Sequence, residues 1–193
     1  MRCVIVSDFG AVNGGAAKVA IESARGLAEA GVDIVFACAI GPVSPRLDHP
    51  RIEVRRFEGE EIWKVGGRIA AARQGIWNGA AHAFLTTLLR QQPPGTIVHL
   101  HQWTKAFSPA AIAAAGGSGL PVTITMHDYF SFCPTGGYFD FKVGRPCGRR
   151  PMSGGCMAAN CDRESYAHKL VRIARQWRSD ESMRALARPL FIH

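Results

Sequence analysis

A histidine and a carboxylate stand at the end of a short apolar segment near the middle of the chain. The segment is PVTITMHD, residues 121–128, and its β-branched residues predict a strand that ends at His127 and Asp128. Ligands of open α/β sheets bind beyond the carboxyl ends of the strands, where the loops diverge. The pair therefore suits proton transfer or the binding of a hydroxylated ligand. The alternative, in which the two residues only cap a helix or close a loop, stays open at this point.

Four of the six cysteines follow this pair within one stretch of the chain: Cys133, Cys147, Cys156 and Cys161. Four thiolates within 29 residues are enough for a tetrahedral zinc site, and a cytosolic chain favours metal over disulfides. The spacing lacks the paired C-x-x-C turns of well-known zinc sites. A structural zinc is therefore one hypothesis, and reduced packing cysteines or a bridge formed after purification are the alternatives.

A glycine pair lies between the first predicted strand and the first predicted helix. Residues 3–8, CVIVSD, form the continuous apolar run that a buried parallel strand needs, and Gly14 and Gly15 lead into a helix over 18–30. Backbone without side chains can approach a phosphate closely, and the amides and dipole at the helix N-terminus stabilise the negative charge of the phosphate. The spacing departs from G-x-G-x-x-G, so a tight turn without a ligand is the alternative.

The remaining pattern predicts an α/β fold in a single domain over 1–193. Further strands are expected over 32–37, 51–57, 96–100 and 121–126, and helices over 62–90 and from Ser108 to 116. This order predicts a doubly wound, mostly parallel Rossmann-like sheet, with 129–165 as a cysteine-rich insertion. The fourth strand ends in His99-Leu100-His101, and we expect only one of the two histidines, His101, to face the crevice.

The formal net charge of +8 is concentrated near the C-terminus, because residues 142–193 contain eleven Lys and Arg but four Asp and Glu. Such a tail suits an anionic partner, or it is a solvated face that a further domain balances. Its helix, from Ser165 to about 188, carries arginines on more than one face, so no clean membrane-binding stripe is evident. It also lacks the interleaved aromatics of nucleic-acid binders, and no nucleic acid is expected as a partner.

No segment has the length of a membrane span or the pattern of a secretory signal. We therefore expect a cytoplasmic protein, with peripheral contact at the inner face of the membrane as an alternative. The last residues, Phe191 to His193, resemble the start of another buried strand. This pattern predicts that the domain is incomplete at its C-terminus.

These motifs together resemble the amino-terminal domain of family 4 glycosyltransferases, which are retaining enzymes of the two-domain GT-B fold. The resemblance covers Arg2 to Trp177. It is carried by GGAAKVAIESARGLAEAGVDI, by VHLHQWTKAFSPAAI and above all by PVTITMHDYFSFCPTGGYFDF. The segment with the four cysteines is similar to an insertion in one branch of the family.

The resemblance implies roles for particular residues. Gly14 and Gly15 match the turn that approaches the donor diphosphate, and His101 is assigned to the same donor- or acceptor-binding group. His127 matches the strand-end histidine near the transferred sugar and the acceptor hydroxyl. Asp128 matches the neighbour that orients the loop or the histidine.

The resemblance also implies what else the reaction needs. In such enzymes the amino-terminal domain mainly holds the acceptor, here a glycan or a lipid-linked acceptor of the cell-envelope polysaccharide type. A carboxy-terminal domain, which we expect this chain to meet in cis or in trans, binds the nucleotide-sugar donor, so the chain alone should be inactive. Backbone amides and basic groups stabilise the leaving diphosphate, so no cofactor is required for catalysis and any zinc is structural.

Three functional hypotheses follow from the sequence. The leading one is the acceptor-side half of a sugar transferase. The second is a Rossmann-like module that binds a nucleotide or glycan without turnover. The third, a basic nucleic-acid-binding protein, has the least support.

Overall fold

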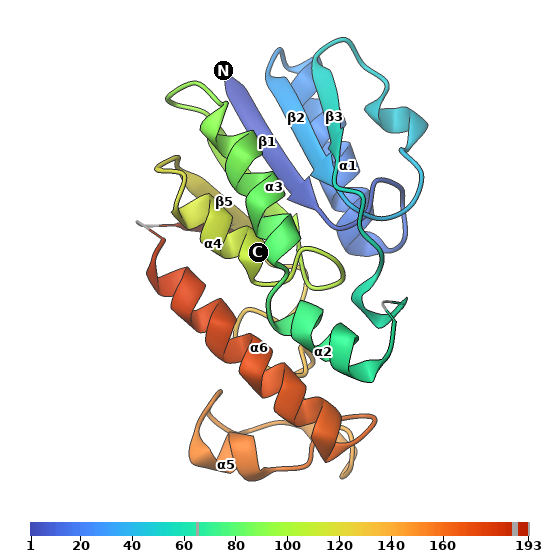
Figure 1. The fold of residues 1–193 in the computed structure, drawn as a ribbon, viewed down its shortest axis with the longest axis vertical. Helices are drawn as coiled ribbons and strands as arrows, with labels where there is room; N and C mark the ends of the chain where they lie inside the picture. Colours follow the sequence, from blue (N-terminus) through green and yellow to red (C-terminus); the bar gives the residue numbers. More distant parts are fainter. Residues whose placement is uncertain (65, 187–188, 193) are drawn as a thin grey trace.

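Residues 1–64, 66–186 and 189–192 are described by the computed structural model. Their main feature is a sheet of six strands in the order β3-β2-β1-β4-β5-β8, and every neighbouring pair is parallel (Figure 1). The strands are β1 (Arg2–Ser7), β2 (Asp33–Cys38), β3 (Ile52–Arg56), β4 (Ile97–Gln102), β5 (Val122–Thr125) and β8 (Leu190–Ile192). This topology confirms the predicted doubly wound, Rossmann-like sheet.

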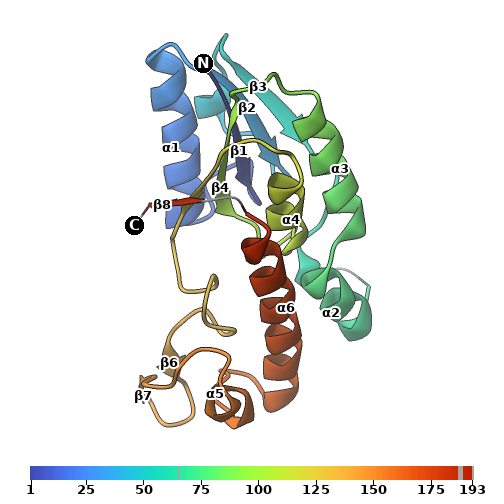
Figure 2. The ribbon, with the colours of Figure 1, turned by 90° about the vertical axis from the view of Figure 1, so that its left-hand side faces the viewer.

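Helices cover both faces of the sheet and extend beyond its carboxyl edge. Helix α1 (Gly15–Glu29) lies on one face, whereas α3 (Gly79–Arg90) and α4 (Ala110–Gly116) lie on the other (Figure 2). Helices α2 (Arg68–Ile76) and α6 (Tyr166–Arg184) pack against each other where the strands end, and α6 also packs against α4. No helix among the described residues is long and apolar enough to cross a membrane.

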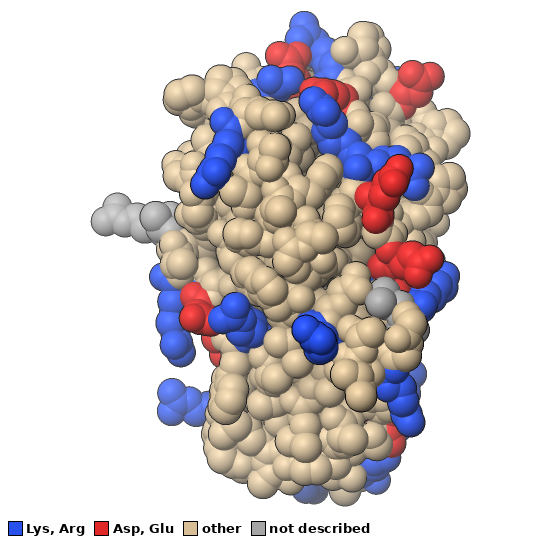
Figure 3. All heavy atoms as spheres, in the orientation of Figure 1, with Lys and Arg blue, Asp and Glu red and all other residues tan. Residues whose placement is uncertain are grey.

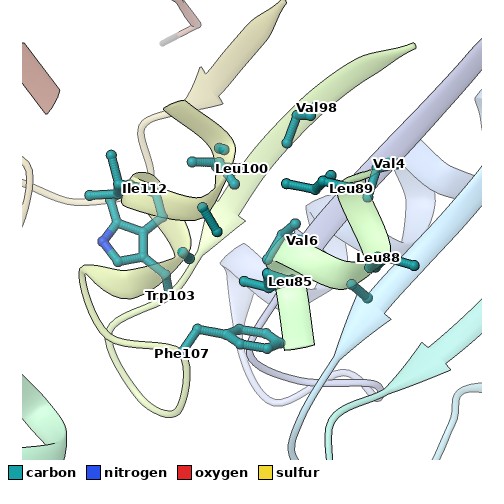
Figure 4. Packing of buried hydrophobic residues seen from close by; sticks show 14 of the residues in the cluster. Val4, Val6, Leu85, Leu88, Leu89, Val98, Leu100, Trp103, Phe107 and Ile112 are labelled. Carbon is teal, nitrogen blue, oxygen red and sulfur yellow. The ribbon is translucent and has the colours of Figure 1, made fainter. Parts of the chain in front are cut away.

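The core is divided between the two faces by the alternation of side chains along the strands. In β1, Cys3 and Ile5 are buried in the cluster that includes residues of α1. Val4 and Val6 point the other way, toward Leu85 of α3 and the α4 side (Figure 4). Because the strand is buried on both faces, it has the uninterrupted apolar sequence by which it was predicted.

The helix expected over 62–90 is in fact three elements, since a short 3₁₀ turn (Ile62–Lys64) precedes α2 and α3. The break before α3 falls at Asn78, whose side chain accepts a hydrogen bond from the Ala81 amide at 3.1 Å and donates to the Ala106 carbonyl at 2.8 Å. An asparagine that caps one helix cannot also continue the previous one. Gly75 lies inside α2 and does not end it.

Helix α4 begins at Ala110, two residues after Ser108, where the sequence predicted the helix to begin. Ser108 has a φ of 60°, and its hydroxyl accepts hydrogen bonds from the Asn78 amide at 2.8 Å and the Ala110 amide at 3.4 Å. The serine therefore joins the starts of α3 and α4, and the helix itself starts at Ala110.

The insertion over 129–165 lies beyond the carboxyl edge of the sheet, beside the first half of α6 (Figure 2). It contains an antiparallel pair, β6 (Phe139–Asp140) and β7 (Arg145–Pro146), and the short helix α5 (Gly154–Ala158). The Ser165 hydroxyl then caps α6 by accepting a hydrogen bond from the His168 amide, and the helix begins where the sequence predicted it.

A buried carboxylate joins the ends of the central strands. Asp8, directly after β1, is inaccessible to solvent, and its two oxygens accept hydrogen bonds from three consecutive amides. These belong to Lys105 at 2.7 Å, and to Ala106 and Phe107 at 3.0 Å each. The loop after β4 is therefore fixed against the end of β1, at the edge where ligands of such sheets bind.

The variant Asp8→Asn tests this carboxyl through the pH dependence of stability. Burial raises the pKa of Asp8 to about 6 from an ordinary value of 3.8, although the three amides act in the opposite direction. Between these pH values the folded chain keeps a proton that the unfolded chain has lost, so the stabilisation contributed by Asp8 declines as pH rises. We expect the stability advantage of the wild type over Asp8→Asn to shrink by about 2–3 kcal/mol between pH 4 and pH 7.

Urea unfolding at several pH values measures this difference. The exposed Asp48, changed to Asn, is the matched control and should show no comparable trend. An advantage that instead grows with pH would mean that the three amides hold the ionised carboxylate below its ordinary pKa.

Candidate functional site

Three histidine rings meet at the carboxyl ends of β4 and β5. His101 Nδ1 and His127 Nε2 are 3.1 Å apart, and the ring of His99 lies 4.1 Å from that of His101 between centroids. His99 Nε2 is 2.7 Å from the hydroxyl of Thr125 on β5. The expectation that only one histidine of β4 faces this side was wrong, because side chains two residues apart in a strand point to the same face.

Burial keeps these rings neutral at pH 7. It lowers the pKa of His99 to about 4 and that of His101 to about 3, and neighbouring histidines add to the effect. Burial also lowers the pKa of His127, while the charge of Asp128 opposes this shift. A neutral imidazole has one donor and one acceptor nitrogen, so the His101–His127 contact holds a single shared proton.

The contact leaves two nitrogens with different surroundings. His127 Nε2 is engaged by His101, so Nδ1 is the nitrogen available to a ligand. His101 Nε2 is buried and has no hydrogen-bond partner among the described residues. A hollow of about 10 Å³ adjoins both rings, with Thr125 and Met126 in its lining, which is close to the space that one water needs.

Asp128 makes its contact with the following loop rather than with the histidine. The side chain is exposed, and Oδ1 accepts a hydrogen bond from the Phe130 amide at 2.9 Å. Such a turn fixes the direction in which the chain leaves β5. In this structure the residue orients the loop, and it acts on His127 through its charge.

Helix α6 holds the same loop from the other side. The buried guanidinium of Arg175 donates to the Pro134 carbonyl at 3.0 Å and lies 4.5 Å from the centroid of the Phe130 ring. Gln176, also buried, donates to the Ser131 carbonyl at 3.1 Å. Sequence reasoning missed both residues. In the sequence, Arg175 and Gln176 are two neighbouring polar residues of a helix. Nothing near them in the sequence shows that their side chains are buried and not exposed to solvent.

The glycine turn lies at the same edge of the sheet, after β1, which neighbours β4. Gly14 precedes α1 with a φ of 140°, a conformation that side chains rarely adopt, and both Gly14 and Gly15 are exposed. A Cβ added at either glycine would meet no atom within 4 Å. Helix α1 has neither a side-chain cap nor an acidic residue in its first turn, so its N-terminal amides face open space.

The clustered cysteines have separate environments. Cys133 is buried, but hydrogen bonds from Thr135 and from nearby backbone amides outweigh burial and lower the pKa of its thiol. The Sγ of Cys147 lies 3.8 Å from Arg149, and that of Cys161 lies 3.1 Å from Nζ of Lys169. None of the six cysteines forms a disulfide.

The predicted zinc site is not assembled by these side chains. No three His, Cys, Asp or Glu residues gather as a ligand set within the described ranges. The Cys161 sulfur faces an ammonium, which repels a metal cation. The side chains as placed here do not form the zinc site, and the zinc hypothesis is still untested. Metal analysis of the purified, reduced protein tests it, and about one equivalent of zinc would require the insertion to rearrange around the metal.

This fold and this edge of the sheet define an α/β domain of the kind that forms the amino-terminal half of GT-B glycosyltransferases. The family model described as glycosyl transferase 4-like domain matches residues 14–188. The chain therefore belongs to this family, as its motifs indicated. A search of the curated proteins finds no match. All the predicted site residues fall within the matched range.

We expect the histidine rings to titrate well below the ordinary imidazole pKa of 6.5. Long-range ¹⁵N–¹H NMR spectra should give midpoints of about 4 for His99 and about 3 for His101, because the folded chain excludes water from the charged rings. With depressed pKa values in the folded state, stability should fall as pH drops below about 6.5, where the unfolded chain gains protons first. A midpoint of His101 near 6.5 would contradict the buried geometry.

Lys169→Met should destabilise the insertion. The Lys169 ammonium is fully buried and donates to the carbonyls of Cys156 and Ala159, as well as facing Cys161. Methionine has a similar length, but it leaves both carbonyls unpaired, which should cost about 2–4 kcal/mol in urea unfolding. The exposed Lys18 of α1, changed to Met, is the control and should stay within about 0.5 kcal/mol. Equal stability of the two variants would mean that Lys169 does not hold the insertion.

Proposed function

We propose that this chain is the acceptor-side domain of a glycosyltransferase. It would move a sugar from a nucleotide-sugar donor to a glycan or lipid-linked acceptor of the cell-envelope polysaccharide type. The observation that carries the proposal is a neutral histidine, His127, at the carboxyl edge of a sheet whose sequence belongs to the glycosyl transferase 4-like family.

The geometry supports separate tasks for the two parts of this edge. A neutral His127 can hydrogen-bond a sugar hydroxyl through Nδ1, because His101 holds its other nitrogen. The amides that follow Gly14 and Gly15 can approach a diphosphate and stabilise the charge that develops on it as the bond to the sugar breaks. Neither task calls for a metal ion.

We infer further that the donor's nucleotide is bound by a second domain, which joins this one in cis or in trans. Residues 1–193 would form the amino-terminal domain, and 129–165 its insertion. The alternative function is a module that binds a nucleotide or glycan without turnover. One result distinguishes the two functions. A transferase domain transfers labelled sugar when a donor-binding domain is present, and a binding module does not.

The test is the variant His127→Ala in a transfer-competent assembly of this chain with a donor-binding domain. We expect turnover to fall about 100-fold or more, because the hydroxyl loses its hydrogen-bond partner in the transition state. The melting temperature should be nearly unchanged, since His127 is only half-buried. His127→Gln, which keeps hydrogen-bonding groups, should retain part of the activity.

His49→Ala is the matched control, since His49 precedes β3 at the opposite edge of the sheet and should leave turnover unchanged. Full activity of His127→Ala would rule out the role given to this residue. Binding of glycan by the assembly without any transfer would favour the binding module.

A further inference from the structure

The rings of His101 and His127 meet edge to edge. Their centroids are 5.3 Å apart with 27° between the ring planes, whereas His101 Nδ1 and His127 Nε2 are only 3.1 Å apart. The difference between these distances is close to the largest that two imidazole rings allow, so both nitrogens lie near the line that joins the centroids. This is the geometry of a hydrogen bond and not of face-to-face stacking. The His99 ring, 4.1 Å from that of His101 between centroids, packs against it and holds this orientation.

The direction of this hydrogen bond, and not a charge, decides what the pair offers to a ligand. Charged side chains are scattered over the face that Figure 3 shows, whereas burial keeps the two rings neutral. A neutral imidazole has one N–H and one bare nitrogen. If His101 Nδ1 donates to His127 Nε2, the second proton of the pair lies on His127 Nδ1. If His127 Nε2 donates instead, the second proton lies on His101 Nε2 and His127 Nδ1 is bare.

The chemistry of the rings favours His127 as the donor. The two nitrogens of histidine are not equivalent, and a free neutral ring carries its proton mainly on Nε2, the nitrogen further from the backbone. With His127 Nε2 as the donor both rings have this tautomer, and with His101 Nδ1 as the donor neither ring has it. The Asp128 carboxylate does not oppose this preference through a hydrogen bond, because its Oδ1 accepts from the Phe130 amide.

The buried nitrogen of His101 is compatible with this direction. Its Nε2 has no hydrogen-bond partner among the protein groups that the structure describes, and a buried N–H without an acceptor costs about 1–3 kcal/mol. The hollow of about 10 Å³ that His101 and His127 line has room for one water, which can accept a hydrogen bond from this nitrogen. A bare Nε2 would need the same water as a donor, so the buried position does not reverse the preference.

We propose that His101 is a positioning residue for His127. It accepts the hydrogen bond of His127 Nε2–H and so leaves a lone pair on His127 Nδ1, the nitrogen available to a ligand. This nitrogen takes a ligand group that donates a hydrogen bond, such as a hydroxyl, and does not pair with an ether or carboxylate oxygen. The choice of a sugar hydroxyl as that group rests on the proposed function, but the position of the proton does not.

The test is long-range ¹H–¹⁵N NMR of the ¹⁵N-labelled full chain at about pH 8, where both rings are neutral. We expect the proton of His127 on Nε2 and a bare Nδ1. We also expect a scalar coupling across the hydrogen bond, between His127 Nε2 and His101 Nδ1. A proton on His127 Nδ1, an average over both tautomers, or the absence of this coupling overturns the proposal.

Two variants at one position separate the acceptor from the bulk of the ring. His101→Asn keeps an oxygen acceptor near the place of Nδ1, so the His127 nitrogens should keep their wild-type chemical shifts. His101→Leu removes the acceptor, and both nitrogens should move toward the averaged shifts of two exchanging tautomers. The same His127 shifts in both variants would mean that His101 only fills space.

The wild-type spectra decide the position of the proton even where His101→Leu does not fold. They also need no sugar transfer. A loss of the proposed transferase function therefore leaves this assignment standing, and a wrong tautomer leaves the transfer test with His127→Ala valid.

Discussion

The site depends on the way in which Asp8 ties together the ends of three strands. Its carboxylate accepts three amides from residues 105–107, its own amide donates to the Gln102 carbonyl at 2.9 Å, and its carbonyl accepts from Ile40 at 2.8 Å. Loops diverge at the carboxyl edge of a parallel sheet, so they need such a fastening to stay in register. With β1, β2 and β4 joined in this way, His101 at the end of β4 has a fixed position against His127.

The loop after His127 is held in place by α6, which buries a charged guanidinium to do so. Burial lowers the pKa of Arg175 to about 10, so the helix keeps a desolvated guanidinium in order to reach the Pro134 carbonyl and the Phe130 ring. Lys169, also buried, donates to the carbonyls of Cys156 and Ala159 in the insertion. Helix α6 therefore buries polar side chains toward the loop and the insertion, while Tyr166, Leu170 and Trp177 are exposed together with Glu181 and Arg184.

Much of the fold was predictable because its signals are local. Buried parallel strands require continuous apolar runs, and these located β1, β2, β4 and β5 to within a residue or two. The histidine pair of β4 was misjudged only in its facing, which the period of a strand determines. Asp8 itself had a local signal, an acidic residue closing the apolar run CVIVS, but its three partners lie almost a hundred residues further along the chain.

The sequence by itself determined the order of the strands and helices, the family, and the presence of His127, His101 and the glycine turn at strand ends. Each of these follows from residues close together in the chain. Only the tertiary structure decided that His101 shares a proton with His127, that Lys169 faces Cys161, and that α6 buries Arg175 and exposes Trp177. These contacts join residues 8 to 45 positions apart, and their energies depend on desolvation, which leaves no periodic pattern in the sequence.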